Sequence, residues 1–127
     1  MPAIAIIGAS KDRHKYGNRA IHAYLAQGWT VYPVNPREAE IEGLTAYPSV
    51  SDLPGPVDRA SLYVPAEVGI QLLDAIHARG VQELWVNPGS GSPELVARAE
   101  QLGLTVIEAC SIVAIQEEAL AYVDDEP

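Results

Sequence analysis

Basic side chains gather behind a glycine turn near the start of this chain. Four of its eight lysine and arginine residues lie between positions 11 and 19, although the whole sequence has a formal net charge of −9. An apolar run over residues 3–7 precedes the turn Gly8-Ala9-Ser10, and a helical apolar pattern follows the basic residues. A strand, a glycine turn and a helix N-terminus form an anion site, because free backbone N–H groups and the helix dipole meet there. The pattern predicts a site for a phosphate-bearing ligand.

The elements that position this site alternate between strand and helix. Apolar and β-branched runs predict strands over residues 3–7, 30–34, 60–64, 83–86 and 104–107. Apolar spacing and terminating glycines predict helices over residues 18–27, 66–79, 93–102 and 110–123. Residues 38–56 have little periodicity and predict an irregular crossover, with a helical turn beginning at 51–53. We therefore expect an α/β fold: a single domain over residues 1–127, with a Rossmann-like, doubly wound parallel sheet of five strands flanked by helices.

Four short loops follow the predicted strands at their carboxyl ends. They are Gly8-Ala9-Ser10, Asn35-Pro36-Arg37, Val64-Pro65 and Asn87-Pro88-Gly89. In doubly wound sheets, ligands bind at the carboxyl edge, near the point where the strand order reverses. The four loops are therefore expected to line one binding crevice.

The motifs of two common nucleotide-binding classes are missing. Eight residues separate Gly8 from Gly17, so the dinucleotide pattern Gly-x-Gly-x-x-Gly is absent, and so is the Walker pattern of ATPases and GTPases. The second strand ends beside Arg37 rather than beside a carboxylate. A guanidinium pairs well with a ribose phosphate, which leaves NADP or coenzyme A (CoA) as the candidate ligand.

Several short stretches favour CoA over NADP by resemblance. They are Ile7-Gly8-Ala9-Ser10, Lys15-Tyr16-Gly17, Tyr32-Pro33-Val34-Asn35-Pro36, Glu40-Ile41-Glu42-Gly43, Tyr47-Pro48-Ser49-Val50, Asp52-Leu53-Pro54, Val57-Asp58, Val64-Pro65, Leu84-Trp85-Val86-Asn87-Pro88-Gly89 and Cys110. In order and spacing over nearly the whole chain, the sequence resembles the small Rossmann-like CoA-binding proteins. It is similar to the N-terminal domain of the succinyl-CoA synthetase alpha subunit.

The resemblance implies that CoA lies across the strand ends. It assigns phosphate contacts to Gly8 through Ser10 and to Lys15 through Gly17, and it places the nucleotide end beside Asn35 through Arg37. The full set of implied binding residues is Gly8, Ala9, Ser10, Lys15, Tyr16, Gly17, Asn35, Pro36, Arg37, Val64, Pro65, Asn87, Pro88 and Gly89. Asn87 departs from the glutamine that this family usually has before Pro-Gly.

No group of residues predicts catalysis or a metal site. Ser10 and Cys110 are possible nucleophiles without an identifiable base, and the three histidines have no partner at ligand spacing. The leading hypothesis is a stand-alone protein that binds CoA or an acyl-CoA without evident catalysis of its own. The alternatives are an NADP-dependent oxidoreductase and the CoA-binding subunit of a ligase completed by another chain.

The composition limits the classes of binding partner and the cellular compartment that we expect. Seventeen acidic residues against eight basic ones argue against nucleic acid and anionic membranes as partners. The sequence shows no membrane-spanning run or signal peptide, and its single cysteine suits a reducing compartment, so a cytoplasmic location is expected. The sequence does not decide whether the chain forms a homo-oligomer or binds a ligase partner.

Overall fold

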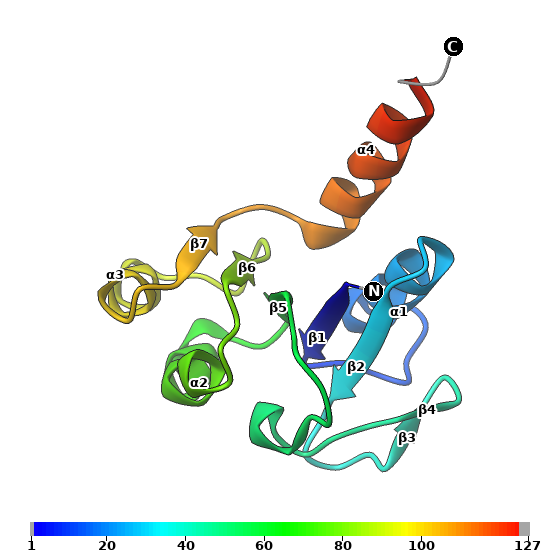
Figure 1. Cartoon of the computed structure of the whole chain (residues 1–127). Coiled ribbons are helices and arrows are strands. Elements are labelled where there is room, and N and C mark those ends of the chain that lie inside the picture. Colours follow the sequence, from blue (N-terminus) through cyan, green and yellow to red (C-terminus); the bar gives the residue numbers. More distant parts are fainter. Residues whose placement is uncertain (1, 125–127) are drawn as a thin grey trace.

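A five-stranded parallel sheet forms the centre of the protein, with strand order β2-β1-β5-β6-β7 (Figure 1). The computed structural model describes residues 2–124. The strands of the sheet are β1 (Ala3–Ile7), β2 (Thr30–Val34), β5 (Arg59–Leu62), β6 (Glu83–Val86) and β7 (Thr105–Ile107). The helices are α1 (Tyr16–Ala26), α2 (Ala66–Ala78), α3 (Pro93–Gln101) and α4 (Ser111–Asp124). The predicted α/β class and doubly wound parallel sheet are confirmed.

Strand β1 organises the sheet because all five of its residues are apolar and buried. It pairs with β2 on one side and with β5 on the other, so that Ile7 lies in register with both Val34 and Leu62. The strand order reverses at β1. The turn at Gly8 therefore opens at the switch point, where doubly wound sheets bind ligands.

The two faces of the sheet carry separate apolar clusters. Ile4 and Ile6 pack with Ile21 and Tyr24 of α1. Ala5 and Ile7, which point to the opposite face, belong to the cluster that includes residues of α2 and α3. This alternation within one apolar strand is expected for a strand buried on both faces.

Residues 38–56 are more regular than the sequence predicts. They contain a short hairpin of β3 (Glu40–Ile41) and β4 (Leu44–Thr45), followed by a 3-10 turn at Val50–Asp52. The two hairpin residues, Glu42 and Gly43, have φ angles of 53° and 77°. A two-residue turn with positive φ matches the twist of a hairpin, but glutamate is an unusual residue there and gave no signal.

The remaining differences concern element ends. Helix α1 begins at Tyr16 rather than at residue 18, and β5 covers residues 59–62 rather than 60–64. Pro33 lies inside β2, where a missing backbone donor is tolerated because β2 is the edge strand.

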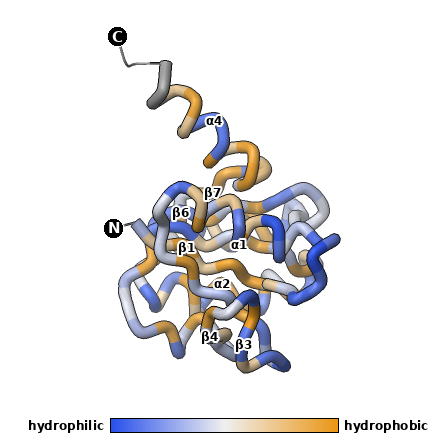
Figure 2. The backbone as a smooth tube through the Cα atoms, turned by 90° about the vertical axis from the view of Figure 1, so that its right-hand side faces the viewer, coloured by the Kyte–Doolittle hydropathy of each residue, from blue (hydrophilic) through white to orange (hydrophobic). Residues whose placement is uncertain are grey.

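Helix α4 begins against the body and then extends away from it (Figures 1 and 2). Its residues Ile112 and Ile115 pack with the α1 cluster, whereas Leu120 is 63% exposed. Among residues 2–124, no helix is both long enough and apolar enough to span a bilayer.

Candidate functional site

A crevice of about 480 Å³ opens at the carboxyl edge of the sheet. Its lining comes from the turn after β1, the start of α1 and the loops after β2, β5 and β6. The lining residues are Gly8, Ala9, Ser10, Lys15, Tyr16, Gly17, Asn35, Tyr63, Val64, Pro65, Pro88, Gly89 and Ser90. The four predicted loops therefore meet in one place.

Two glycines bring the turn and α1 into contact at the floor of the crevice. Gly8 has a φ of 92°, and a Cβ there would lie 2.7 Å from the carbonyl oxygen of Tyr63. A Cβ on Gly17 would lie 2.5 Å from the carbonyl oxygen of Gly8. Both positions therefore require glycine, because the turn after β1, the loop after β5 and the start of α1 approach one another too closely for a side chain.

Three residues that line this opening have backbone N–H groups without an acceptor in the described part of the protein. The backbone N–H groups of Ser10, Tyr16 and Gly17 donate no hydrogen bond to any other group within residues 2–124. All three residues line the crevice, and α1 begins there with Lys15 at its N-cap. Unpaired N–H groups at a helix N-terminus, with a lysine beside them, favour an anion.

Two other residues of the basic run, Lys11 and Arg13, are paired with carboxylates. Lys11 pairs with Glu38 at 3.3 Å, and the Arg13 guanidinium contacts both carboxylate oxygens of Glu42 at 3.1 and 3.3 Å. Hydrogen bonds from Arg13 and then Asn18 hold the pKa of the Glu42 carboxyl below its usual value. The positive charge of this run is therefore smaller at the site than the sequence suggests.

Asn35 shapes the loop after β2. Its side-chain amide donates to the Ala9 carbonyl at 2.9 Å, and its Oδ1 accepts the backbone N–H of Arg37 at 2.7 Å. These bonds tie the loop after β2 to the turn after β1. The Arg37 side chain is exposed at the outer end of this loop.

An apolar cavity of about 250 Å³ adjoins the crevice. It shares Gly8 and Val64 with the crevice, and its wall includes Pro36 of the loop after β2. The remaining lining is Ile7, Val34, Pro48, Ser49, Val50, Val68 and Leu72. A ligand with an anionic centre and a flat apolar end fits this pair of spaces.

Comparison with known proteins identifies the family of this chain. The family described as the CoA binding domain matches residues 2–116 of this sequence. The chain belongs to this family.

Curated relatives are larger enzymes. The chain is 37% identical over 115 residues to an ADP-forming acetate–CoA ligase II subunit alpha from Pyrococcus furiosus, covering 82% of this chain and 25% of the relative. It is 32% identical to an ADP-forming acetate–CoA ligase I from Archaeoglobus fulgidus, covering 82% of this chain and 17% of the relative. This CoA-binding domain therefore spans a quarter or less of the length of these two relatives.

Solved structures include both small and large proteins of similar fold. A conserved hypothetical protein from Pyrococcus furiosus has a TM-score of 0.82 and 38% identity, with 90% of this chain and 99% of that chain covered. A dinucleotide-forming acetyl-coenzyme A synthetase from Candidatus Korarchaeum cryptofilum, solved with phosphate and ADP, has a TM-score of 0.75 and 37% identity. That match covers 84% of this chain and 25% of the synthetase chain. The predicted relationship to a succinyl-CoA synthetase-like family is confirmed.

The CoA-binding domain brings most of its predicted site residues together. Three of them, Pro36, Arg37 and Asn87, lie outside the crevice lining. Pro36 lines the adjoining apolar cavity, and Arg37 lies at the outer end of its loop. Ligand contacts by all the predicted residues stay predictions.

Asn87 is buried, and its side chain makes hydrogen bonds to other groups of the protein. Its amide donates to the Ser61 hydroxyl and the Leu62 carbonyl, both at 2.8 Å, while its Oδ1 accepts the backbone N–H of Ser111 at 2.9 Å. Both donors of the amide are therefore occupied. Asn87 fixes the position of the loop Pro88-Gly89, which does line the crevice.

Tyr63 is a crevice residue that the sequence interpretation missed. Its hydroxyl lies 3.0 Å from the Ser111 hydroxyl, and burial raises the pKa of its phenol. Its position directly before the matched pair Val64-Pro65 was the available signal. Tyr63 and Asn87 both meet Ser111, so the crevice wall is linked to the first residue of α4.

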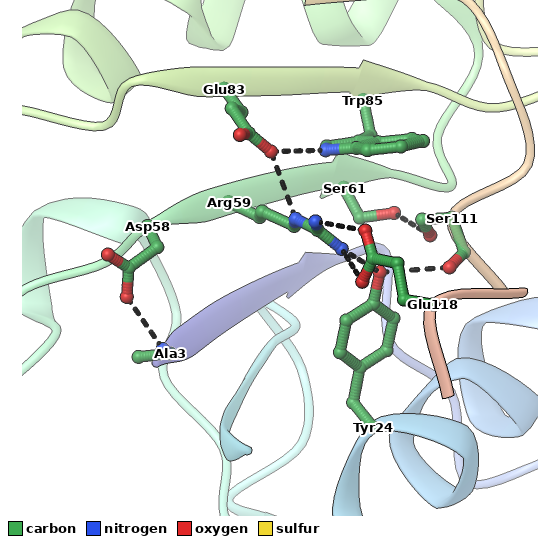
Figure 3. Close-up of polar contacts among 9 residues, drawn as sticks. All are labelled: Ala3, Tyr24, Asp58, Arg59, Ser61, Glu83, Trp85, Ser111 and Glu118. Carbon is green, nitrogen blue, oxygen red and sulfur yellow. Dashed lines mark hydrogen bonds and ion pairs between the residues drawn. The ribbon is translucent and has the colours of Figure 1, made fainter. Parts of the chain in front are cut away.

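A second polar cluster anchors α4 near the opposite end of β5 (Figure 3). The Arg59 guanidinium lies between the Trp29 and Trp85 rings, 4.8 and 4.9 Å from their centroids, and pairs with Glu118 of α4 at 2.6 Å. It also pairs with Glu83 at 2.9 Å. Burial alone would lower the pKa of Arg59, but hydrogen bonds with Glu118 and Tyr24 outweigh it and raise that pKa.

The possible nucleophiles have no basic partner in the part of the chain that the structure describes. The Ser10 hydroxyl accepts the backbone N–H of Asp12 at 3.0 Å, and Cys110 is a partly exposed free thiol at the start of α4. Among the side chains that the structure describes, no three of His, Cys, Asp or Glu cluster to hold a metal ion.

Proposed function

We propose that this chain binds CoA, or an acyl-CoA, as a module that works without a catalytic group of its own. The observation that carries the proposal is the continuity of the crevice and the apolar cavity at Gly8 and Val64. CoA has an anionic pyrophosphate, joined through a ribose to the flat aromatic ring of adenine, and the charged group and the ring faces match the two spaces. The match of residues 2–116 to the CoA binding domain family supports the same ligand.

In this proposal the pyrophosphate lies against the free N–H groups of Ser10, Tyr16 and Gly17, with Lys15 beside it. Helix N-termini favour phosphate through unpaired donors and the helix dipole. The adenine occupies the apolar cavity between the loop after β2 and helix α2. Arg37, at the rim beside Pro36, then reaches the ribose 3′-phosphate through its planar set of donors.

Calorimetric titration with CoA and with NADP tests this proposal. We expect one CoA bound per chain and at least tenfold weaker binding of NADP. The wild-type melting temperature is expected to rise with CoA concentration, because a ligand that binds only the folded state stabilises it. Absence of CoA binding at millimolar concentration, or tighter binding of NADP together with hydride transfer, would overturn the proposal.

A second candidate is the CoA-binding part of a ligase completed by another chain. Its support is the 37% identity to a ligase subunit named alpha. Affinity purification of the tagged chain from its own cells tests it. Co-purification of an ATP-binding ligase chain in constant ratio favours this candidate, whereas a solitary species favours the stand-alone module.

A further inference from the structure

Helix α4 contacts the body of the protein through its inner side (Figures 1 and 2). On this side Ser111 and Ile115 are buried, and Glu118 pairs with Arg59 at 2.6 Å. The helix has 14 residues, a length that is marginal for a helix in water unless its apolar side chains are packed. A further contact on the outer side of α4 would therefore stabilise the helix.

The outer side of α4 carries a stripe of exposed residues. Val113 and Leu120 are 48% and 63% exposed and lie seven residues apart, which places them on the same side of the helix. Gln116 and Glu117 are exposed between them on that side, and we call these four residues the outer stripe. Among the side chains that the structure describes, Glu117 has no basic partner. The outer stripe thus combines two apolar side chains with a carboxylate that is available for pairing.

A groove of about 560 Å³ lies between α1 and the first turns of α4. Its apolar wall includes Ala23 and Ile112, and Val113 of the outer stripe also lines it. Tyr16, which is 62% exposed, lines the groove as well. Among the described side chains, five large apolar ones are exposed, and Tyr16, Val113 and Leu120 are three of these. Such a concentration of exposed apolar side chains is typical of a protein–protein interface.

The groove carries positive charge that complements the outer stripe. Arg13 and His22 line the groove, but Glu42 pairs with both of them, at 3.1 and 3.2 Å. Arg19 also lines the groove and lies over the Tyr16 ring, 5.3 Å from its centroid. No carboxylate among the described side chains pairs with Arg19. The groove therefore offers a cation, and the outer stripe of the same chain offers a carboxylate.

The outer stripe is complementary to itself when two copies of α4 lie antiparallel. A two-fold axis between positions 116 and 117 places Val113 of each copy against Leu120 of the other. It also places Gln116 beside Glu117 of the other copy, where the amide can donate to the carboxylate. Each contact then occurs twice, as a two-fold interface requires. The same arrangement directs the outer half of each α4 toward the groove of the other copy, so that Glu117 approaches Arg19.

We propose that two copies of this chain form a homodimer through α4. In the dimer, Leu120 of one copy packs against Val113 and the apolar wall of the groove in the other, and Glu117 pairs with Arg19. A second copy is the occupant because the groove suits a helix that carries a carboxylate and an apolar residue one turn apart, and α4 is such a helix. One stripe and one groove from each copy make a small interface, so we expect a dissociation constant in the micromolar range.

Sedimentation equilibrium without CoA measures the dimer directly. The average mass of the wild-type protein should rise from 13.6 kDa toward twice this value as its concentration increases. In Leu120→Lys the dissociation constant should rise about tenfold or more, because the dimer loses the packing of two leucine side chains. Leu25→Lys is the matched control, since Leu25 is 40% exposed on α1 and does not line the groove. This variant should dimerise like the wild type.

A charge exchange tests the ion pair across the interface. Arg19→Glu and Glu117→Arg should each raise the dissociation constant about tenfold or more, because like charges then face one another. The protein with both changes has opposite charges at the two positions again and should recover most of the wild-type affinity. Its net charge equals that of the wild type, so a general effect of charge does not explain the recovery.

A wild-type protein that stays at 13.6 kDa at concentrations up to about 1 mM would overturn the dimer. A dimer that survives Leu120→Lys and both charge reversals would overturn the proposed interface, and so would a combined variant that is as weak as the single ones. All of these measurements are made without CoA, so their failure leaves the proposed function as it stands.

Discussion

The backbone N–H of Ser111 donates a hydrogen bond of 2.9 Å to the side-chain oxygen of Asn87. Through this bond the loop after β6, which lines the crevice, is attached to the first residue of α4. The Asn87 amide completes the link by donating to the Ser61 hydroxyl and the Leu62 carbonyl of β5. The buried Asn87 side chain thus fixes the position of the loop that lines the crevice.

Replacing this amide should destabilise the fold. In Asn87→Asp a buried carboxylate faces the Leu62 carbonyl without a donor, and such groups cost about 1–3 kcal/mol or more. We expect differential scanning calorimetry to show a melting temperature lowered by several degrees. Gln82→Glu makes the same chemical change at an exposed side chain and should melt close to the wild type. Equal melting of both variants and the wild type would show that Asn87 is not a structural anchor.

The contact between Gly17 and the Gly8 carbonyl should be required for binding. In Gly17→Ala the new Cβ would meet that oxygen at 2.5 Å, so α1 must move away from the turn. Loss of one charge-assisted hydrogen bond to the pyrophosphate costs about 1.5–3 kcal/mol, which weakens CoA binding roughly tenfold or more.

Gly103→Ala is the control for this change. Gly103 has a φ of 85° with open space around its Cβ position, and it is absent from the linings of the crevice and the apolar cavity. Alanine there is strained and should lower stability by about 1–2 kcal/mol while leaving CoA affinity unchanged. Retained CoA affinity in a folded Gly17→Ala protein would contradict the placement of the pyrophosphate.

Arg37 should distinguish CoA from 3′-dephospho-CoA. If its guanidinium pairs with the 3′-phosphate, Arg37→Ala weakens CoA about tenfold or more and leaves 3′-dephospho-CoA nearly unchanged. Titration of both ligands measures the difference, and Arg98→Ala, which removes another exposed arginine, should affect neither. Equal losses for both ligands would place Arg37 away from the 3′-phosphate.

Arg59 should hold α4 on the body. Lysine keeps the charge in Arg59→Lys but lacks the planar donors that reach Glu83 and Glu118 together, so we expect the free energy of unfolding to fall by about 1–3 kcal/mol. Urea unfolding followed by tryptophan fluorescence measures the change, because Trp29 and Trp85 enclose the guanidinium. In Arg98→Lys the exposed pair with Asp74 should change stability little. A matching small effect at Arg59 would be evidence against an anchoring role.

Local sequence patterns were enough to predict the fold and the loops that form most of the site. The buried run of β1, the turn at Gly8 and the proline-rich loops at the strand ends are each readable within a few residues, and parallel strands place such loops on one edge. The hairpin at Glu42 and Gly43 gave no signal, because glutamate rarely adopts a positive φ. Its carboxylate then neutralises Arg13, a contact that joins residues 29 positions apart.

The structural role of Asn87 could not be predicted, because it also depends on contacts between residues far apart in the sequence. Its partners Ser61 and Ser111 lie 26 and 24 residues away along the chain. A sequence places Asn87 at a strand end, where ligand-binding residues gather, but it does not say whether the side chain faces the ligand or the core. Only the packing of β5 and α4 around the amide decides this.

A crystal structure of the protein with CoA would locate the ligand directly. We predict that the pyrophosphate lies against the backbone N–H groups of Ser10, Tyr16 and Gly17, with the adenine in the apolar cavity beside Pro36. A CoA molecule bound elsewhere, or bound in the crevice with its adenine outside that cavity, would contradict this prediction.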